Sequence, residues 1–387
     1  MIHRQVAATL LQMASQYPVV AVTGPRQSGK TTLVRALFGK LPYVSLEEPD
    51  RRAFALEDPR GFLAAYPDGA VLDEVQRAPD LLSYLQTLVD RDPRPGRFIL
   101  TGSQQLGLLS GIAQSLAGRV ALIKLLPFSL GELEGSGQAP ATVDKLLLQG
   151  LYPPIYDRGL DPTTWYANYV ATYLERDVRQ LVNVRDLTTF DRFLRLCAGR
   201  SGQLLNLSGL ASDAGVSHNT ARAWVSVLEA SYLVQLLPPY HRSFNKRLVK
   251  TPKLYFLDPG LASWLVGIRT LDQLVVHPLR GALFEGWVVS EALKARYHQG
   301  LAPDLYFWRD NSGHEVDLLR EDGAVLTPFE IKSGRTVVPD FFTGLRRWVT
   351  IAGDAAGQPY LVYGGDERQI RSGVTVLPWR ALGQLER

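Results

Sequence analysis

Three side chains near the end of the sequence have the types and spacing to hold a divalent cation beside a phosphate. They are Asp317 and, in the segment FEIKSG, Glu330 and Lys332. If that segment is a strand, Glu330 and Lys332 point to the same face, because successive side chains of a strand alternate. Two carboxylates could then ligate Mg²⁺ while the ammonium orients or activates a water for hydrolysis.

A second group, near the N-terminus, is suited to binding a nucleoside triphosphate. The segment GPRQSGKT matches GxxxxGK[ST] and lies between a β-branched strand and a helix with apolar residues at helical spacing. Backbone amides of such a loop surround phosphates, the lysine reaches the β and γ phosphates, and the threonine hydroxyl ligates Mg²⁺. We therefore predict ATP and Mg²⁺ as cofactors. The predicted nucleotide-binding residues are Gly24, Pro25, Arg26, Gln27, Ser28, Gly29, Lys30, Thr31, Thr32 and Ser103.

Two carboxylates end the next apolar strand, in the segment GAVLDEVQ. Asp73 would hold Mg²⁺ together with Thr31, and Glu74 would polarise the attacking water. A third strand, RFILTGS, ends in Thr101 and Ser103, where a γ-phosphate sensor would lie. Parallel α/β units bring the carboxyl ends of neighbouring strands to one edge of a sheet, so these groups should meet the glycine loop. We assign catalysis to Lys30, Asp73 and Glu74.

The helices and strands that position these groups are expected to lie in more than one domain. A chain of 387 residues exceeds what one hydrophobic core usually serves, and 46% apolar and 21% charged residues are typical of a globular protein in water. We predict a P-loop core over 1–140, a helical lid over 141–200, a winged-helix domain over 201–270 and a further α/β domain over 271–387. No apolar run could cross a bilayer, and the N-terminal segment has no signal-peptide cleavage site. We therefore expect a cytoplasmic protein without a membrane partner.

The order of these motifs resembles the AAA+ ATPases. GPRQSGKTTL, LDEVQ, ILTGSQ and PFSLGE, followed by GLYPPIYD and YVATYLERDV, are similar to prokaryotic AAA-family ATPases that carry a C-terminal domain of unknown function 4143. The resemblance implies a nucleotide-driven motor or switch made of several copies, with a six-membered ring as the usual arrangement. It also implies that Arg119 is a catalytic arginine finger that reaches the neighbouring subunit's nucleotide. The alternative for a lone arginine is a surface salt bridge.

Residues 204–237 have the pattern of a helix-turn-helix followed by a β wing. Ser208 and Ser217 are expected N-caps, and Gly215 is the expected turn between the helices. The start of the second helix would enter the major groove of DNA. The alternative is a winged helix that serves only as a packing module. The predicted DNA contacts are His218, Asn219 and Arg222 on this helix, and Arg242, Lys246, Arg247 and Lys250 on the segment after it.

That segment, residues 236–257, is a basic stretch without an acidic residue. It also holds Lys253, and Tyr240 and Phe244 are interleaved with its cations. Cations on and after a wing would follow the phosphate backbone, so the stretch predicts non-specific contacts to nucleic acid.

The C-terminal groups have a fourth partner in the helix GALFEGWVVSEALKARYHQ, which carries Glu285 on its packed face. The following strands are joined by an EDGA turn, a hairpin signal. A helix acid, an Asp and Glu-x-Lys in that order resemble the restriction-endonuclease-like fold and its PD-(D/E)xK pattern, although Val316 replaces the proline. By this resemblance Glu285, Asp317 and Glu330 would ligate Mg²⁺, and Lys332 would activate water. The alternatives are ordinary strands with a surface Glu–Lys pair, or an inactive DNA-binding platform.

These predictions combine into one α/β protein with a P-loop AAA+ core on a parallel sheet, a helical lid, a winged helix-turn-helix and a restriction-endonuclease-like C-terminal domain. We expect an oligomeric ATPase that remodels or moves along DNA, including branched repair or recombination intermediates such as Holliday junctions. Two alternatives remain. One is a nucleotide-dependent regulatory switch that binds a protein partner, and the other is an ATP-gated, metal-dependent DNA nuclease.

Overall fold

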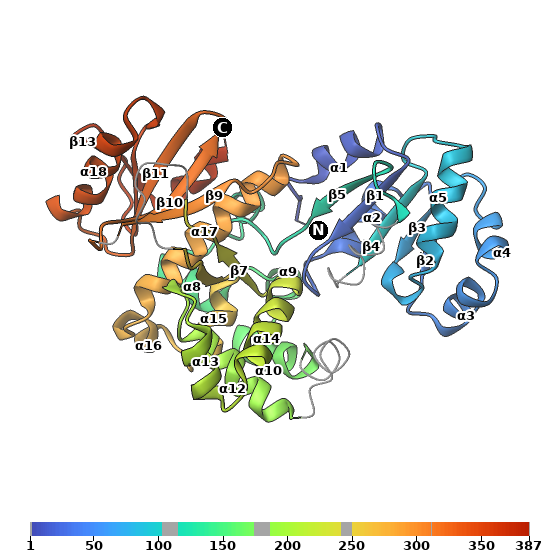
Figure 1. Ribbon diagram of the computed structural model, residues 1–387, viewed down its shortest axis with the longest axis horizontal. Coiled ribbons are helices and arrows are strands. Elements are labelled where there is room, and N and C mark those ends of the chain that lie inside the picture. Colours follow the sequence, from blue (N-terminus) through green and yellow to red (C-terminus); the bar gives the residue numbers. More distant parts are fainter. Residues whose placement is uncertain (1, 103–114, 174–185, 241–249, 311, 387) are drawn as a thin grey trace. The chain divides into compact units, whose positions relative to one another are not determined.

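The computed structural model describes residues 2–102, 115–173, 186–240, 250–310 and 312–386 (Figure 1). The chain forms two compact units. Unit 1 comprises Met1–Phe128, Ala230–Tyr232 and Tyr297–Leu301, and unit 2 comprises the remaining segments, Ser129–Glu229, Leu233–Arg296 and Ala302–Arg387. Unit 1 therefore contains two short segments from later in the chain as well as the whole N-terminal region.

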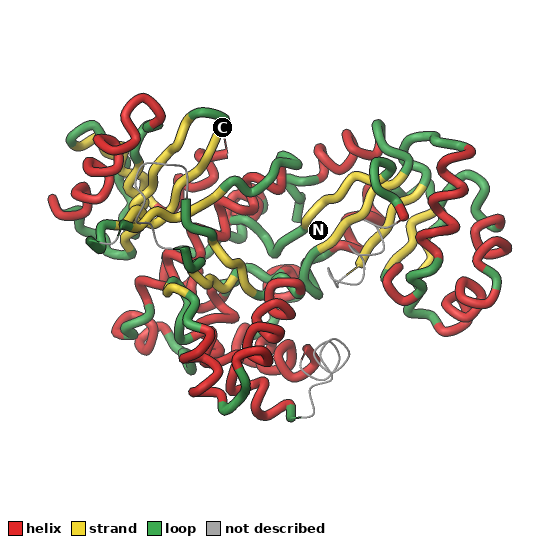
Figure 2. Tube along the Cα trace, in the orientation of Figure 1, coloured by secondary structure: helices red, strands yellow, loops and turns green. Residues whose placement is uncertain are grey.

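Unit 1 is a parallel sheet covered by helices; Figure 2 shows the strands in yellow and the helices in red. The described strands form one five-stranded sheet in the order β2-β3-β4-β1-β5, and each pair within it is parallel. This confirms the predicted mixed α/β class with a parallel sheet. The strands are β1 (Val19–Thr23), β2 (Tyr43–Ser45), β3 (Ala70–Asp73), β4 (Phe98–Gly102) and β5 (Val120–Lys124). The helices are α1 (Ala7–Ala14), α2 (Lys30–Leu37), α3 (Pro49–Glu57), α4 (Pro59–Ala64), the 3₁₀ turn η1 (Val75–Arg77) and α5 (Leu81–Arg91).

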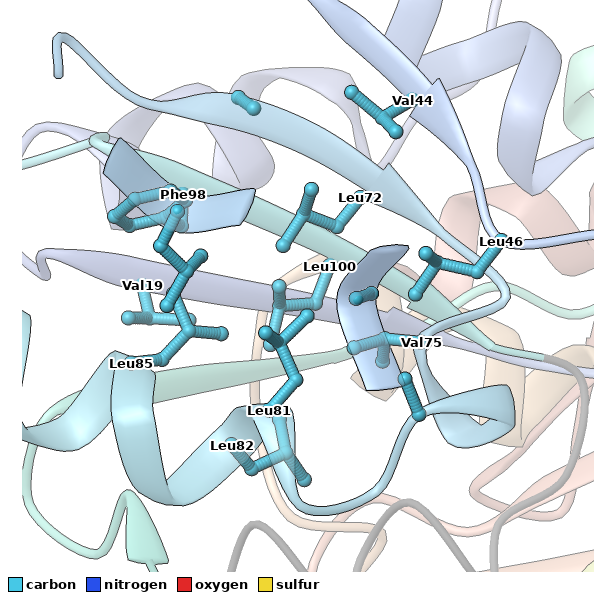
Figure 3. Close-up of a cluster of buried hydrophobic side chains, with 14 of the residues drawn as sticks. Val19, Val44, Leu46, Leu72, Val75, Leu81, Leu82, Leu85, Phe98 and Leu100 are labelled. Atoms are coloured by element: carbon cyan, nitrogen blue, oxygen red, sulfur yellow. The ribbon is translucent and has the colours of Figure 1, made fainter. Parts of the chain in front are cut away.

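The strands of unit 1 are apolar on both faces, as expected for a sheet with helices on each side. Alternate residues of β1 divide between two buried clusters. Val19 packs with side chains of α4 and α5, such as Leu85 (Figure 3), whereas Val20 packs with side chains of α1 and α2, such as Leu10 and Val34. The sheet is thus fixed from both sides, which leaves its strand ends to carry polar groups.

The first half of unit 2 is mainly helical. Its helices are α7 (Leu130–Gly135), α8 (Val143–Gln149), α9 (Pro153–Asp157), α10 (Pro162–Tyr173), α12 (Leu187–Ala198), α13 (Leu207–Ala214), α14 (His218–Ala230), α15 (Pro259–Leu265) and α16 (Leu271–Val276). Three antiparallel strands form a small sheet in the order β6-β8-β7: β6 (Gln203–Leu204), β7 (Val234–Leu237) and β8 (Lys253–Phe256). Rings of Phe190 and Phe193 on α12 meet the Trp224 ring of α14 edge-on, with centroids 5.0 and 5.1 Å apart.

The turn between α13 and α14 agrees with the sequence prediction in two of three details. Gly215 is left-handed, with φ 72°, and the Ser217 hydroxyl accepts a hydrogen bond from the Thr220 amide at 3.1 Å. The prediction for Ser208 was wrong. Asn206 caps α13 by accepting from the Gly209 amide, and Ser208 lies inside the helix. Both residue types are good N-caps, and the helix begins two positions earlier than a cap at Ser208 would require.

The second half of unit 2 is a separate six-stranded sheet, in the order β13-β14-β12-β11-β10-β9 among the described residues. β10 and β11 form the predicted hairpin, in which Asp322 pairs with Val325 across a turn at Gly323. β12 pairs with β11 in parallel after α18. The strands are β9 (Leu305–Arg309), β10 (Glu315–Asp322), β11 (Val325–Lys332), β12 (Tyr360–Tyr363), β13 (Gln369–Arg371) and β14 (Val374–Pro378). The helical elements are α17 (Arg280–His298), η3 (Pro339–Phe342), α18 (Thr343–Ala352), η4 (Gly353–Ala355) and η5 (Trp379–Glu386).

The single cysteine, Cys197 on α12, is buried. Burial raises the pKa of its thiol to about 12, so this thiol stays protonated and unreactive at neutral pH.

Within the described ranges, no helix combines the length and apolar character needed to cross a bilayer.

Candidate functional site

The P-loop connects β1 to α2 at the carboxyl edge of the parallel sheet of unit 1. Its backbone has positive φ at Gly24, Gln27 and Gly29, with values of 151°, 60° and 93°. A Cβ atom added to Gly24 would lie 2.1 Å from the carbonyl oxygen of Leu125, so only glycine fits there. The loop thus has a backbone path suited to cradling a phosphate, and α2 starts directly after it at Lys30, with its N-terminus toward the loop.

The Lys30 side chain is buried against the P-loop. Its Nζ atom donates to the carbonyl oxygens of Gly24 and Pro25, at 3.0 and 2.8 Å. Among the other predicted nucleotide-binding residues, Ser28 is buried, Arg26, Gly29 and Thr31 are half-buried, and Gln27 and Thr32 are exposed. Ser103 lies outside the described residues.

Asp73, the last residue of β3, meets the P-loop as predicted. Its carboxylate accepts from the Thr31 hydroxyl at 3.0 Å, and the Thr101 hydroxyl on β4 is a second, very close donor. A third donor was missed by sequence reasoning. The Tyr43 hydroxyl on β2 donates to Oδ2 of Asp73 at 2.6 Å. Burial and the neighbouring carboxylate raise the pKa of Tyr43 well above its usual value, so the phenol remains a donor.

Glu74 lies directly after the strand, in a left-handed conformation with φ 57° and ψ 44°. Its backbone amide donates to the Thr101 hydroxyl at 3.3 Å, and its carboxylate accepts from the Gln76 side chain. A residue with a Cβ atom is strained in this conformation, and such strain concentrates at functional sites. Glu74 therefore leaves the line of β3 beside Asp73, as its predicted role requires.

Arg4 is a second residue that sequence reasoning missed. Its guanidinium is buried and donates to the carbonyl oxygens of Ser28, at 2.7 Å, and Leu126, at 2.6 Å. It also lies over the Phe128 ring, 4.9 Å from the centroid. Arg4 thus joins the P-loop to the chain segment after β5. A single arginine near the start of a sequence gives no signal of such a contact.

Arg119 lies at the amino-terminal ends of the parallel strands, opposite the P-loop. It precedes β5, which runs parallel to β1 with Val120 beside Val19. Its guanidinium forms a two-point contact with the Asp90 carboxylate of α5, including an Nη2–Oδ2 distance of 2.9 Å. The hydrogen bond from Arg119 lowers the pKa of Asp90 and raises that of Arg119. The structure thus pairs this arginine within its own chain, and its role as a finger remains a prediction.

The predicted DNA contacts on α14 lie on its exposed side. His218, Asn219 and Arg222 are exposed, whereas Ala221 and Val225 are buried. Lys250 is also exposed. Arg242, Lys246 and Arg247 lie outside the described residues.

The basic stretch is not one continuous charged surface. Tyr240 is buried with Trp308 and Trp348 in the core of the C-terminal sheet, so its ring is not available to stack on a base. Phe244 lies outside the described residues. Lys253, which the sequence places with the other cations, is also buried. Charge patterns along a chain therefore overstate the cations available to a phosphate backbone here.

The predicted acidic residues Glu285, Asp317 and Glu330 come together with Glu315, Lys253 and Lys332 in what we call the C-terminal cluster. Lys332 Nζ lies 2.5 Å from Oε1 of Glu330 and 3.4 Å from Oδ2 of Asp317. The same Oδ2 atom accepts from the Ile331 amide at 2.8 Å. Oε2 of Glu330 is buried and has no hydrogen-bond partner among the described residues.

Lys253 enters the C-terminal cluster from β8. Its Nζ atom lies 3.0 Å from Oε1 of Glu285 on α17 and makes a still closer contact with Glu315 at the start of β10. The Tyr255 hydroxyl donates to the same Oε1 atom of Glu285. The helix acid of the predicted metal site is therefore already bonded to an ammonium and a phenol.

Burial and mutual repulsion act together on the carboxylates of the cluster. Burial and the Asp317 carboxylate raise the pKa of Glu330 to about 8, against the opposing effect of Lys332. The same two causes raise the pKa of Glu285. Burial lowers the pKa of Lys253, but Glu285, Asp317 and Glu315 together more than reverse this, and its pKa lies above the usual value. At neutral pH the lysine is charged and Glu330 is largely neutral.

The two acidic sites fit a metal differently. At Asp73, oxygen atoms of the P-loop threonine and of β3 lie together, which suits Mg²⁺. In the C-terminal cluster, the ammonium of Lys253 contacts an oxygen of Glu285 that a metal would use. Over the part of the chain that the structure describes, no group of three or more His, Cys, Asp or Glu residues could hold a metal ion. The Lys253 contact argues against a metal at Glu285, and the predicted metal site stays untested.

Three protein families match successive parts of the chain. An AAA domain matches residues 16–134, a domain of unknown function (DUF8612) matches residues 140–272, and a domain of unknown function (DUF4143) matches residues 280–382. Among solved structures, the chain is similar to the Walker-type ATPase PABY2304 of Pyrococcus abyssi, with 16% identity, 68% of this chain and 96% of that chain covered, and a TM-score of 0.47. It is also similar to AMPPCP-bound DnaA from Aquifex aeolicus, with 18% identity, 58% and 85% covered, and a TM-score of 0.24.

Two curated proteins are similar over most of the chain. They are the uncharacterized proteins Rv2008c of Mycobacterium tuberculosis and Mb2031c of Mycobacterium bovis. Each is 35% identical over 347 residues, which cover 89% of this chain and 76% of the relative. With its P-loop, its Asp73 edge and these matches, the chain belongs to the family of AAA-type P-loop ATPases that carry a C-terminal DUF4143 domain.

Proposed function

We propose that this AAA-type protein hydrolyses ATP at the P-loop edge of unit 1 and uses the cycle to act on DNA. The observation that carries the nucleotide part is the position of Asp73, 3.0 Å from the Thr31 hydroxyl of the P-loop. Both side chains offer oxygen ligands, which Mg²⁺ takes together with substrate phosphates. Bound Mg²⁺ would neutralise charge on the phosphates.

Each residue at this edge has a role in the proposed reaction. Lys30 would bind the β and γ phosphates, and the P-loop amides would surround them. Thr31 and Asp73 would hold the metal. Glu74 would orient and polarise the attacking water. Tyr43 would keep the Asp73 carboxylate in place through the hydrogen bond at 2.6 Å.

The position of Arg119 supports an assembly of several copies, which we propose to be a ring. Five residues of β1 separate the level of Arg119 from the P-loop, a distance of roughly 16 Å along the strand. An arginine side chain is too short to span that distance, so Arg119 can act only on the nucleotide of another copy. This proposal requires that Arg119 leave Asp90 when subunits meet.

Mixing two inactive variants tests this assignment. Arg119→Ala chains and Lys30→Ala chains should each lose ATP turnover, because one lacks the finger and the other the phosphate ligand. An equal mixture should regain part of the activity, since some interfaces then combine an intact Lys30 with an intact Arg119. Arg91→Ala, which removes an exposed arginine from α5, is the matched control and should keep full turnover. A mixture as inactive as its components would contradict a finger that acts between subunits.

The architecture around α14 supports DNA as the ligand of unit 2. The order α12, β6, α13, α14, β7 and β8, with β8 as the middle strand, supports the proposed winged helix-turn-helix. In DNA readers of this type the start of the second helix of the motif enters the major groove. That start is where His218, Asn219 and Arg222 are exposed.

Stimulation of ATP turnover by DNA tests the coupling. Turnover is measured with duplex, single-stranded and four-way junction DNA at stated ionic strength, because phosphate contacts weaken steeply with salt. We expect at least one of these to raise turnover several-fold, and Arg222→Ala with Asn219→Ala to abolish the rise. Arg158→Ala, an equal charge loss at an exposed residue after α9, should leave it intact. Steady ATP turnover that no DNA changes would reject this function and favour a regulatory switch that docks a protein partner.

A further inference from the structure

We infer that Lys253 is the resident cation of the C-terminal cluster and that its ammonium keeps divalent metals out of this site. The inference concerns unit 2 alone and does not depend on the nucleotide site. It accounts for a group of carboxylates that resembles a metal site in sequence and does not form one in the structure.

The first support is the position of the ammonium. The Lys253 side chain is only 4% exposed, although lysine is among the residues least often buried. Its Nζ atom contacts Glu285 of α17, at 3.0 Å, and Glu315 of β10. One positive group therefore joins carboxylates from two separate elements, and one of these, Glu285, is a predicted metal ligand.

The second support is that the shared oxygen is already occupied. Oε1 of Glu285 accepts from both Lys253 and the Tyr255 hydroxyl. A divalent metal would need that carboxylate at about 2.0–2.2 Å and would then lie beside a buried ammonium. Two cations at such a distance repel strongly where water does not screen them. Metal and lysine are therefore alternatives at this site.

The third support is the set of rings around the ammonium. The rings of Phe307 and Tyr255 lie 5.5 and 6.0 Å from Nζ, which favours a positively charged group at this position. The rings and the carboxylates of Glu285 and Glu315 together hold the Lys253 ammonium in place.

Manganese binding to the nucleotide-free full chain tests the inference. Electron paramagnetic resonance counts the Mn²⁺ bound per chain for the wild type, Lys253→Met, Lys250→Met and the double variant Lys253→Met with Asp317→Asn. We expect Lys253→Met to bind one more Mn²⁺ than the wild type, and the double variant to lose it again. Lys250→Met removes an exposed lysine from the same basic stretch and should bind as the wild type does.

Two results would overturn the inference. One is a folded Lys253→Met chain that binds no more Mn²⁺ than the wild type. The other is a wild-type chain that binds a Mn²⁺ which Asp317→Asn removes, because the cluster would then hold a metal beside its lysine. The second comparison needs no change at Lys253 and decides the matter even if Lys253→Met does not fold. Lys253→Gln, which keeps a donor for Glu285 without the charge, provides a second chance to observe the added Mn²⁺.

Discussion

The molecule has two carboxylate sites that differ in the groups that donate hydrogen bonds to the carboxylates. Asp73 in unit 1 accepts from the hydroxyls of Thr31, Tyr43 and Thr101. The C-terminal cluster of unit 2 is bonded instead by the ammonium groups of Lys253 and Lys332. Hydroxyl groups fix a carboxylate without adding charge, whereas each lysine offsets one negative charge. Asp73 therefore keeps the whole charge of its carboxylate beside these hydroxyls, while two ammonium groups reduce the negative charge of the C-terminal cluster.

The largest difference between the two sites should appear in catalysis. Glu74→Gln removes the group that polarises water and should lower ATP turnover about 10²–10⁴-fold with little change in nucleotide affinity. Asp317→Asn makes the same chemical change in the C-terminal cluster and should leave turnover within about twofold of the wild type. Steady-state turnover and binding of a fluorescent nucleotide analogue measure both. Equal losses in the two variants would show that the sites do not differ as described.

For the stability of the protein, we expect the larger effect at the C-terminal cluster rather than at the nucleotide site. Lys253→Met leaves the partly buried Glu285 without its ammonium, while Glu315 keeps Arg309, so the free energy of unfolding of unit 2 should fall by about 3 kcal/mol. Lys250→Met, which removes an exposed ammonium, should change it by less than about 0.5 kcal/mol. Urea denaturation followed by tryptophan fluorescence measures the difference. A Lys253→Met protein as stable as Lys250→Met would mean that the ammonium contributes nothing to the packing of α17 on β10.

The response to pH sharpens the comparison further. The pKa of Glu330 is about 8 in the folded chain against an ordinary value of 4.5. Between these values the folded chain keeps a proton that the unfolded chain has lost, so this contribution to stability is complete below about pH 4.5 and is lost as the pH rises to about 8. Glu330→Gln remains neutral and should lose at least about 1 kcal/mol less than the wild type between pH 5 and pH 8. Parallel pH profiles for the two proteins would contradict the assigned pKa.

The smallest expected effect tests the hydroxyl groups around Asp73. Tyr43→Phe deletes the donor at 2.6 Å, worth about 1 kcal/mol, and should raise the Mg²⁺ concentration for half-maximal ATP turnover roughly fivefold. The maximal rate should change little, because the metal ligand itself remains. Tyr84→Phe on α5 is the control for loss of a phenol hydroxyl. An unchanged Mg²⁺ requirement would show that Thr31 and Thr101 alone hold the carboxylate.

The features that the sequence predicted correctly are those that depend on short patterns of neighbouring residues. The P-loop needs glycines at two fixed positions, and φ values of 151° and 93° at Gly24 and Gly29 explain why. The apolar run that ends at Asp73 fixes where β3 stops, and the glycine at 323 fixes the hairpin of β10 and β11. In each case the residues that determine the geometry are neighbours in sequence.

The parts that were missed depend on contacts between distant segments. Alternation along β8 says that Lys253 and Tyr255 share a face, but not that Glu285 lies on it. Tyr240 belongs to the basic stretch in sequence, and it is buried because β9 and α18 supply its aromatic partners. Tyr43 and Arg4 gave no signal at all, since their partners lie at least 24 positions away. Such pairings become visible only when the packing is known.

The contacts of Arg4 and Gly24 have a consequence for how work can leave the ATPase. Gly24 lies against the Leu125 carbonyl, and Arg4 bonds both Ser28 and Leu126 while covering Phe128. Phe128 is also the last residue of the first and longest segment of unit 1. The cradle for the phosphates is therefore bonded to the end of this segment, so a shift that a ligand imposes on the cradle would reach the main chain where it first leaves unit 1.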